Sequence, residues 1–279
     1  MNMRELYRGP EYEPWVKRVG TGLTCSEESM VRRYLKPELS TLEAGTGPGR
    51  IVFALRELGF TSLAGFDFLP EFIEWARGRD AAGAIDFQVQ DAASLDYPDA
   101  SFDQLVYFGQ VVSLIPDTEQ REAALDEAAR ILRPGGVALF SSECYEIRRA
   151  NPIWPPLLLY LGAYRKLRGS SLSRQQLPWL KVGEKVSPGA LLDRGPHAYC
   201  YRFGELAEGL RSRGLKILGI GSCAQLRSGS LCSSPEQLAS ERVSGTLWIA
   251  GTKGVSPAES SITGAASDSI GDRQGGQRS

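Results

Sequence analysis

A glycine-rich turn constrains the fold of this chain more than any other segment. The sequence Leu42-Glu43-Ala44-Gly45-Thr46-Gly47-Pro48-Gly49-Arg50 alternates three glycines with other residues directly after a short apolar run. Glycine permits backbone angles that other residues resist, and it lets a ligand approach the main chain closely. The first free N–H groups of a following helix then face the bound molecule. The segment therefore predicts a strand that turns sharply into a helix next to a ligand.

The spacing of the glycines and a later carboxylate narrow the choice of ligand. Turns of this kind can bind NAD, FAD or the adenosyl group of S-adenosylmethionine (SAM). The dinucleotide pattern G-x-G-x-x-G would need a glycine at position 50, where this chain has Arg50. A second predicted strand, residues 62–66, ends in Asp67, 20 residues beyond Gly47. A carboxylate at that place accepts hydrogen bonds from both hydroxyls of a ribose.

Four further segments follow the turn in order along the chain, at suitable spacings. After a third predicted strand, residues 85–89, Asp91 can reach the exocyclic amine of an adenine. With these segments the chain resembles the class I SAM-dependent methyltransferases, strongly over residues 40–145 and in outline over residues 200–253. The resemblance implies an α/β fold with a Rossmann-like, mostly parallel seven-stranded sheet, helices on both faces, SAM as cofactor and methyl transfer as activity. The four segments are Gly65-Phe66-Asp67, Gln90-Asp91-Ala92, Phe102-Asp103-Gln104-Leu105-Val106 and Leu132-Arg133-Pro134-Gly135-Gly136.

The resemblance also implies a set of cofactor-binding residues. Glu43 replaces the aspartate more usual in the family, and we expect it to hydrogen-bond the glycine loop and the amino group of the cofactor. Phe68 is expected to pack on one face of the adenine. Plainer interpretations remain open. The glycines could form a tight turn that binds no ligand, Asp67 could be an ordinary solvated carboxylate, Phe68 could belong to the hydrophobic core, and Asp91 could simply begin a turn. The full predicted set is Glu43, Gly45, Gly47, Gly49, Asp67, Phe68, Asp91, Ala92 and Phe108.

A single α/β domain over residues 1–254 is the expected organisation. Residues 1–37 comprise an arm, residues 1–25, that we expect to be irregular because Pro10 and Pro14 interrupt it, and a helix that begins at Ser26 and ends at Pro37. Residues 255–279 are rich in Gly, Ser and Ala and predict a disordered tail. The other expected elements are helices 51–58, 118–133 and 203–213, and strands 103–108, 137–142, 215–220 and 245–251.

An insertion at residues 145–201, between the fifth and sixth strands, interrupts this alternation. Residues 145–185 contain eight basic and two acidic side chains, a net charge of +6, around the apolar segment 153–161. Such a combination suits a lid over an apolar, acidic substrate, or a patch that rests on an anionic membrane surface. A solvated helix with a small core of its own would explain it equally well.

The composition excludes several classes of protein. A net charge of −1 gives no case for nucleic acid as a partner. Five scattered cysteines without a C-x-x-C pair, together with a single histidine, argue against a disulfide framework and against a metal site. The charged start is no signal peptide, and the longest apolar run is too short to span a bilayer. We expect a cytoplasmic protein, with its oligomeric state undetermined.

The sequence says less about the methyl acceptor. The polar-Pro-Pro-aromatic signature of enzymes that methylate DNA bases or glutamine is missing after the fourth strand, as is the close glutamate pair of protein-arginine methyltransferases. With these acceptors disfavoured, we expect a small organic acceptor that is methylated on O, N or C. Apolar acidic molecules are the candidates. A non-catalytic SAM-binding or partner-recruiting protein is the alternative, and aminopropyl transfer or NAD-dependent oxidoreduction a third.

Four further side chains are candidates for roles at the substrate. His197 precedes the helix that re-enters the core and could act as a general base, although a lone histidine is more often a surface or packing residue. Glu143, after the fifth strand, is another candidate base or substrate anchor. Tyr7 and Tyr12 could close over the sulfonium of SAM, unless burial of the nearby Trp15 is what anchors the arm.

Overall fold

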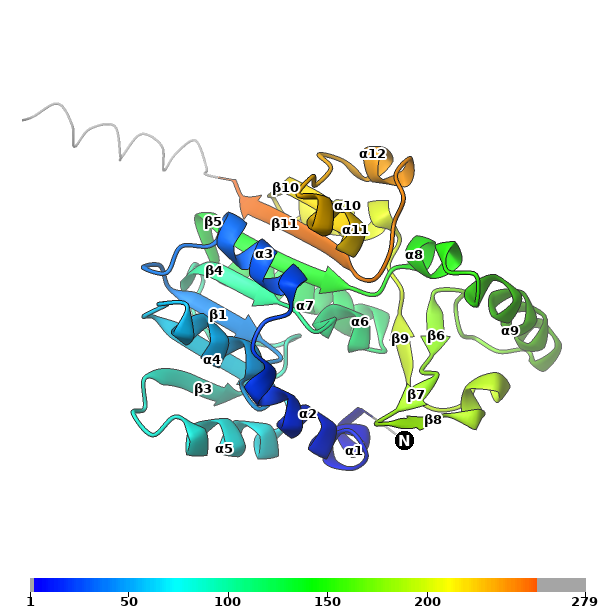
Figure 1. Cartoon of the computed structure of the whole chain (residues 1–279), viewed down its shortest axis with the longest axis horizontal. Helices are drawn as coiled ribbons and strands as arrows, with labels where there is room; N and C mark the ends of the chain where they lie inside the picture. The colour runs from blue at the N-terminus through cyan, green and yellow to red at the C-terminus, as the bar shows by residue number, and fades with distance from the viewer. Residues whose placement is uncertain (1–2, 255–279) are drawn as a thin grey trace, which may run out of the picture.

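A seven-stranded sheet forms the centre of the structure, a computed structural model that describes residues 3–254 (Figure 1). Its strand order is β10-β11-β5-β4-β1-β2-β3. Only β11 runs antiparallel to its neighbours, so the sheet is the mostly parallel, Rossmann-like one that the sequence predicts. The strands are β1 (Thr41–Ala44), β2 (Leu63–Asp67), β3 (Ile85–Val89), β4 (Phe102–Tyr107), β5 (Leu132–Ser142), β10 (Leu215–Ser222) and β11 (Leu247–Lys253).

Helices cover both faces of the sheet because its strands are apolar on both sides. Leu105 and Tyr107 of β4 pack into one core with α7, α10 and α12, whereas Val106 between them packs into the other core with α3, α4, α5 and α11. The helices are α3 (Cys25–Tyr34), α4 (Arg50–Glu57), α5 (Pro70–Arg79), α6 (Val111–Leu114), α7 (Thr118–Ile131), α10 (Phe203–Arg211), α11 (Cys223–Ser228) and α12 (Pro235–Ala239).

Element boundaries differ from the expected ones where capping decides them. Helix α3 begins one residue before Ser26, because Thr24 is its N-cap and forms a reciprocal capping box with Glu27. Helix α7 ends at Ile131, and β5 already pairs with β4 at Leu132. Pro134 and Gly135, for which their residue types would suggest a tight turn between the helix and the strand, instead form an irregularity within β5, where the register against β4 shifts.

The N-terminal arm is helical, so its predicted irregular structure is wrong. It contains α1 (Met3–Arg8), α2 (Tyr12–Arg18) and the short 3-10 helix η1 (Val19–Thr21). Pro10 lies between the two α-helices, and Pro14 lies in the first turn of α2, where a missing N–H removes no hydrogen bond of the helix. The prolines thus shape the arm without preventing helices.

The segment between β5 and α10 packs as a subdomain beyond the carboxyl ends of the parallel strands (Figure 1). Its own small core contains Trp154, Leu177 and Cys200. The elements are α8 (Tyr145–Ala150), α9 (Trp154–Arg168), β6 (Gln176–Pro178), β7 (Lys181–Val182), β8 (Lys185–Val186), η2 (Pro188–Leu192) and β9 (His197–Tyr199). Within residues 3–254 no helix is long and apolar enough to cross a bilayer. The predicted tail, 255–279, lies outside the described residues.

Candidate active site

The glycine turn connects β1 to α4 at the carboxyl edge of the sheet. Gly45 and Gly47 both have a positive φ, +60° and +54°. A Cβ on Gly45 would lie 2.6 Å from Val111, so this position needs glycine for packing. A Cβ on Gly47 would have no protein atom closer than Phe72 at 4.0 Å, and Gly47 lines a cavity. Gly47 therefore exposes bare main chain to whatever occupies that cavity.

Glu43 lies buried beneath the turn and holds it to α4. Its Oε2 accepts hydrogen bonds from the hydroxyl of Thr46, at 2.6 Å, and from the N–H of Val52, at 2.9 Å. No hydrogen bond within the described residues reaches its Oε1, although Glu43 lines the cavity. Burial raises the pKa of Glu43 to about 8, against the lowering effects of Thr46, Arg50 and Val52. A cation in the cavity would complete the environment of this carboxylate.

Asp67 ends β2 and faces the same turn. Its Oδ2 accepts a hydrogen bond from the N–H of Gly47, and its Oδ1 accepts one from the N–H of Leu69, both at 2.9 Å. Burial raises the pKa of Asp67 to about 6, although these backbone contacts lower it. The two contacts fix the rotamer of the carboxylate and leave the remaining lone pairs to accept hydroxyl hydrogens from a ligand in the cavity.

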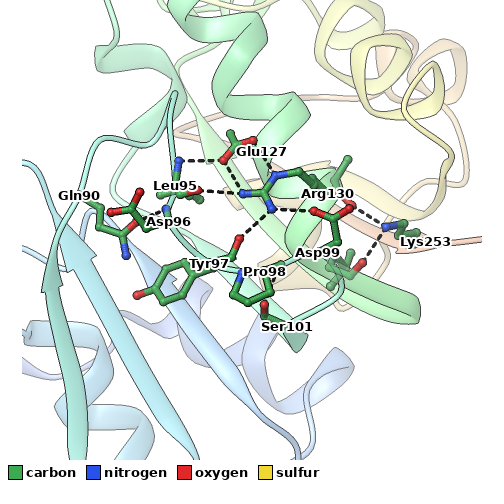
Figure 2. Close-up of polar contacts among 12 residues, drawn as sticks. Gln90, Leu95, Asp96, Tyr97, Pro98, Asp99, Ser101, Glu127, Arg130 and Lys253 are labelled. Carbon is green, nitrogen blue, oxygen red and sulfur yellow. Dashed lines mark hydrogen bonds and ion pairs between the residues drawn. The ribbon is translucent and has the colours of Figure 1, made fainter.

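A loop behind β3 brings Asp91 to the same cavity, and Arg130 of α7 holds that loop in place (Figure 2). The guanidinium of Arg130 donates to the carbonyls of Leu95 and Tyr97 and to the carboxylate of Glu127. Glu127 in turn accepts the N–H of Leu95 at 2.7 Å, and its pairing with Arg130 lowers its pKa. The wall of the cavity that contains Asp91 is thus supported from a helix that the sequence motifs do not include.

The structure brings the predicted cofactor residues together around a cavity of about 450 Å³. Of the nine, only Gly49 is not at its surface, because it packs behind the turn against Phe53. The members at the surface are Glu43, Gly45, Gly47, Asp67, Phe68, Asp91, Ala92 and Phe108. An adenosyl ligand fits these groups. The carboxylates can accept hydrogen bonds from its hydroxyls and amines, Gly47 presents bare main chain, and Phe68 presents an aromatic ring.

Comparison with known proteins identifies the domain. A family model described as a methyltransferase domain matches residues 42–140, the part of the chain that builds the cavity floor. The chain thus contains a methyltransferase domain. Phosphoethanolamine N-methyltransferase 1 of Arabidopsis thaliana is 30% identical over 125 residues, 44% of this chain and 25% of that protein. The ubiquinone/menaquinone biosynthesis C-methyltransferase UbiE of Desulfotalea psychrophila is 34% identical over 121 residues, 41% of this chain and 48% of that protein.

Solved structures agree with the fold of this methyltransferase. A SAM-dependent methyltransferase from Methanosarcina mazei superposes with a TM-score of 0.59 at 20% identity, covering 81% of this chain and 98% of that one. The chain spans less than half of the length of each of these two curated relatives. SAM is accordingly the cofactor of the domain, and the acceptor must be inferred from the rest of the cavity.

The arm covers the cavity of the methyltransferase domain, and the subdomain between β5 and α10 braces the arm. Tyr7 and Trp15 of the arm line the cavity, whereas Tyr12 stacks on Phe72 with ring centroids 5.2 Å apart. Tyr7 meets Trp179 of the subdomain edge to face at 6.4 Å. Beside this pair, the N–H of Gly183 donates to the carboxylate of Glu11. Among the described residues, the subdomain thus supports this cover from outside without lining the cavity itself.

Trp179→Ala should loosen this cover. We expect SAM to dissociate several-fold faster and its affinity to fall about three- to tenfold, because the arm loses an aromatic contact that holds Tyr7 over the cavity. Stopped-flow release of SAM with calorimetry measures both quantities. Tyr164→Ala, which removes an aromatic ring of α9 outside the cavity lining, is the matched control. Equal release rates in the wild type and Trp179→Ala would show that the arm closes without the subdomain.

The other half of the cavity comes from α6, the loop after it and the start of α7, and it is largely apolar, with Asp117 and Gln120 as its polar members. Leu114, Ile115 and Pro116 line it. The buried side chain of Arg121 donates to the carbonyls of Ile115 and Pro116, both at 2.9 Å, and its guanidinium lies 3.8 Å from the ring centroid of Tyr199 in β9. Arg121 therefore shapes the acceptor wall and joins it to the subdomain, without touching the cavity itself.

Neither proposed general base lies at this cavity. His197 Nε2 is 3.1 Å from Asp193 Oδ1, and Asp193 also pairs with Arg165 at 2.6 Å. Glu143 pairs with Arg148 at 2.6 Å. Among the described residues that line the cavity there is no histidine, cysteine or lysine. The structure thus gives His197 and Glu143 the contacts of structural residues of the subdomain.

Sequence analysis missed several groups that line or brace the site. Arg50, weighed only as a departure from the dinucleotide pattern, forms a bidentate pair with Glu27 at 2.6 and 2.8 Å and so ties α3 to the start of α4. Thr46, Leu114, Ile115 and Gln120 also line the cavity. The sequence did hint at this role of Arg50, because a charged residue there directly precedes the apolar residues that begin α4. The acceptor-side residues carry no motif.

Proposed function

We propose that this protein transfers a methyl group from SAM to a small, largely apolar organic acceptor. The cavity supports the proposal: its cofactor half is polar and its acceptor half presents Val111, Leu114 and Ile115. Apolar walls desolvate an acceptor and hold it against the reacting group without specific polar contacts. The relatives include an enzyme of quinone biosynthesis, by name a C-methyltransferase, which fits an apolar acceptor.

The chemistry needs little from the side chains beyond position. SAM, when bound, supplies a methyl group already activated on a sulfonium. Asp67 and Glu43 hold the ligand's donor groups, Tyr7 and Trp15 exclude water, and the acceptor wall sets the direction of approach. Burial, with Asp67 and Glu11 nearby, raises the pKa of Tyr7, so its hydroxyl stays neutral. We infer that the acceptor brings its own nucleophile, such as an ionised hydroxyl, an amine or an electron-rich ring carbon.

Leu114→Lys tests the proposal at the acceptor wall. A charge there should lower methyl transfer to apolar acceptors at least tenfold, because an ammonium group in an apolar wall disfavours their binding, while SAM affinity stays within about twofold. Label transfer from methyl-labelled SAM to hydroxyquinols, phenols and apolar carboxylic acids measures the first quantity, with phosphoethanolamine as the polar comparison. Leu114→Met, which keeps the wall apolar, is the control.

The same assay separates the alternatives. Transfer to phosphoethanolamine alone would contradict an apolar acceptor. SAM binding without transfer to any acceptor would favour a non-catalytic SAM-binding or partner-recruiting protein.

We also propose a cytoplasmic location. All five cysteines are free thiols, and Cys144, Cys200 and Cys232 are buried. Unpaired cysteines are usual in a reducing compartment. Fractionation of the expressed full-length protein, with thiol labelling in the intact cell, would test this location.

A further inference from the structure

The outer surface of α9 and η2 is unusually apolar for an exposed surface. Among residues 3–254, nine large hydrophobic side chains are exposed, and seven of them lie between positions 153 and 192. Leu159 is 78% exposed and Leu167 86%. The seven are Ile153, Leu159, Tyr160, Leu167, Val186, Leu191 and Leu192. We call the part formed by Leu159, Tyr160, Leu167, Leu191 and Leu192 the α9 face.

The helical spacing of α9 separates this face from the core of the subdomain. Trp154, Leu161 and Arg165 are buried on the inner side. Leu159 and Leu167, eight residues apart, lie on one side of the helix with the exposed Lys166 beside them. The leucines are therefore not needed to hold α9 in place.

Polar contacts make the α9 face one rigid surface. The hydroxyl of Tyr160 donates to the carbonyl of Leu191 at 2.8 Å, which places η2 beside α9. Both oxygens of Asp193, next to Leu192, pair with Arg165 at 2.6 Å. His197 joins the same carboxylate, so the histidine first considered as a base helps to position this surface.

The charges around the α9 face have one sign. Residues 147–183 contain no Asp or Glu. Arg149, Lys166, Arg168 and Arg174 are exposed, and within residues 3–254 none of them forms an ion pair. The two arginines of this stretch that do pair, Arg148 and Arg165, are those drawn inward to Glu143 and Asp193. The unpaired cations thus remain available to an anionic partner.

Exposed leucines and unpaired cations together are the properties of a surface that lies in the interface of an anionic bilayer. The absence of acidic residues over positions 147–183 favours an anionic partner, and the exposed leucines beside the cations favour one with an apolar interior. The face also lies at the end of the molecule where the carboxyl edge of the sheet and its cavity are (Figure 1). We propose that the α9 face docks the protein on membranes rich in anionic phospholipid, with the leucines among the acyl chains and the basic residues at the headgroups.

Vesicle co-sedimentation of the full-length protein tests the proposal. Phosphatidylcholine vesicles with about 30% phosphatidylglycerol should bind it at least tenfold better than pure phosphatidylcholine, and salt should weaken the binding, since ion pairing is screened. Leu159→Glu/Leu167→Glu and Lys166→Glu/Arg168→Glu should each reduce binding at least tenfold. Leu218→Glu, at an exposed leucine of β10, is the matched control. All of these positions are exposed, so the melting temperature should stay unchanged.

Docking and methyl transfer can fail separately in this design. The vesicle assay needs neither SAM nor acceptor, and calorimetry with SAM on the same variants should give the wild-type affinity. Equal binding to neutral and anionic vesicles, or full binding by the leucine variant, would overturn the proposal. Concentration-dependent dimerisation that requires Leu159 and Leu167, without vesicle binding, would also overturn it and make the face an interface between copies.

Discussion

Replacing Asp67 by asparagine should weaken SAM binding by at least tenfold and up to about a hundredfold. Hydrogen bonds to a charged acceptor contribute about 1.5–3 kcal/mol. The two oxygens of Asp67 accept the N–H groups of Gly47 and Leu69, so an asparagine must turn its NH2 group toward one of these donors. The substitution therefore removes a ligand acceptor and disturbs the turn at the same time. Isothermal titration with SAM and S-adenosylhomocysteine measures the loss.

Asp86→Asn is the control for Asp67→Asn, because Asp86 lies on the neighbouring strand β3 but is exposed and outside the cavity lining. Its SAM affinity should equal that of the wild type. Burial raises the pKa of Asp67 to about 6, so acidification from pH 7 to pH 5 should weaken SAM binding more in the wild type than in Asp67→Asn. An Asp67→Asn protein with wild-type affinity would remove Asp67 from the site.

The cofactor half could be predicted because its determinants are local. Gly45 and Gly47 lie in the turn after β1 and Asp67 ends β2, and parallel strands bring their carboxyl ends to one edge. Short sequence patterns therefore carry both the fold and this half of the cavity. Their agreement also explains why the expected seven-stranded, mostly parallel sheet and the expected methyltransferase domain are confirmed.

The acceptor half could not be predicted, since it depends on contacts between distant segments. Tyr7 meets Trp179, and Glu11 accepts the N–H of Gly183, across about 170 residues of chain. Arg121 joins α7 to Tyr199 in the same way. No short sequence pattern encodes such pairs of residues. The hydrophobicity of the segments that contain them is compatible with a core, a lid or an exposed surface.

Two single-residue arguments show where local reasoning fails. His197 was a candidate base because its ordinary pKa suits proton transfer, but chemistry alone could not reveal that Asp193, four residues earlier, and Arg165 occupy its surroundings. Pro10 and Pro14 suggested an irregular arm, although proline breaks helices only in their interior. Neighbours in the folded structure decided the first case and position within a helix decided the second, and the sequence gives neither reliably.

Replacing Glu43 by glutamine should change stability and SAM binding in opposite directions. In the unfolded chain Glu43 titrates near its ordinary pKa of 4.5, while burial raises the pKa of Glu43 in the folded, ligand-free protein to about 8. The folded state therefore holds the proton more tightly, and its stability falls as the pH rises from about 4.5 to 8. Glutamine has no proton to lose. Glu43→Gln should melt at the wild-type temperature near pH 4.5 and roughly 5 °C or more above it at pH 8.

Cofactor binding reverses the sign, because a cationic ligand favours the ionised form of Glu43. SAM affinity should be at least tenfold lower in Glu43→Gln at pH 8, since a charged hydrogen bond of about 1.5–3 kcal/mol is lost. Thr46 and Val52 both donate to Oε2, so the carbonyl oxygen of glutamine can keep the turn intact. At pH 7 the wild type should also release more protons on binding SAM than the variant does, which titrations in buffers of different ionisation enthalpy measure. Glu57→Gln, an exposed position at the end of α4, should behave as the wild type in every test, and equal proton release by Glu43→Gln and the wild type would place the ligand's cation away from Glu43.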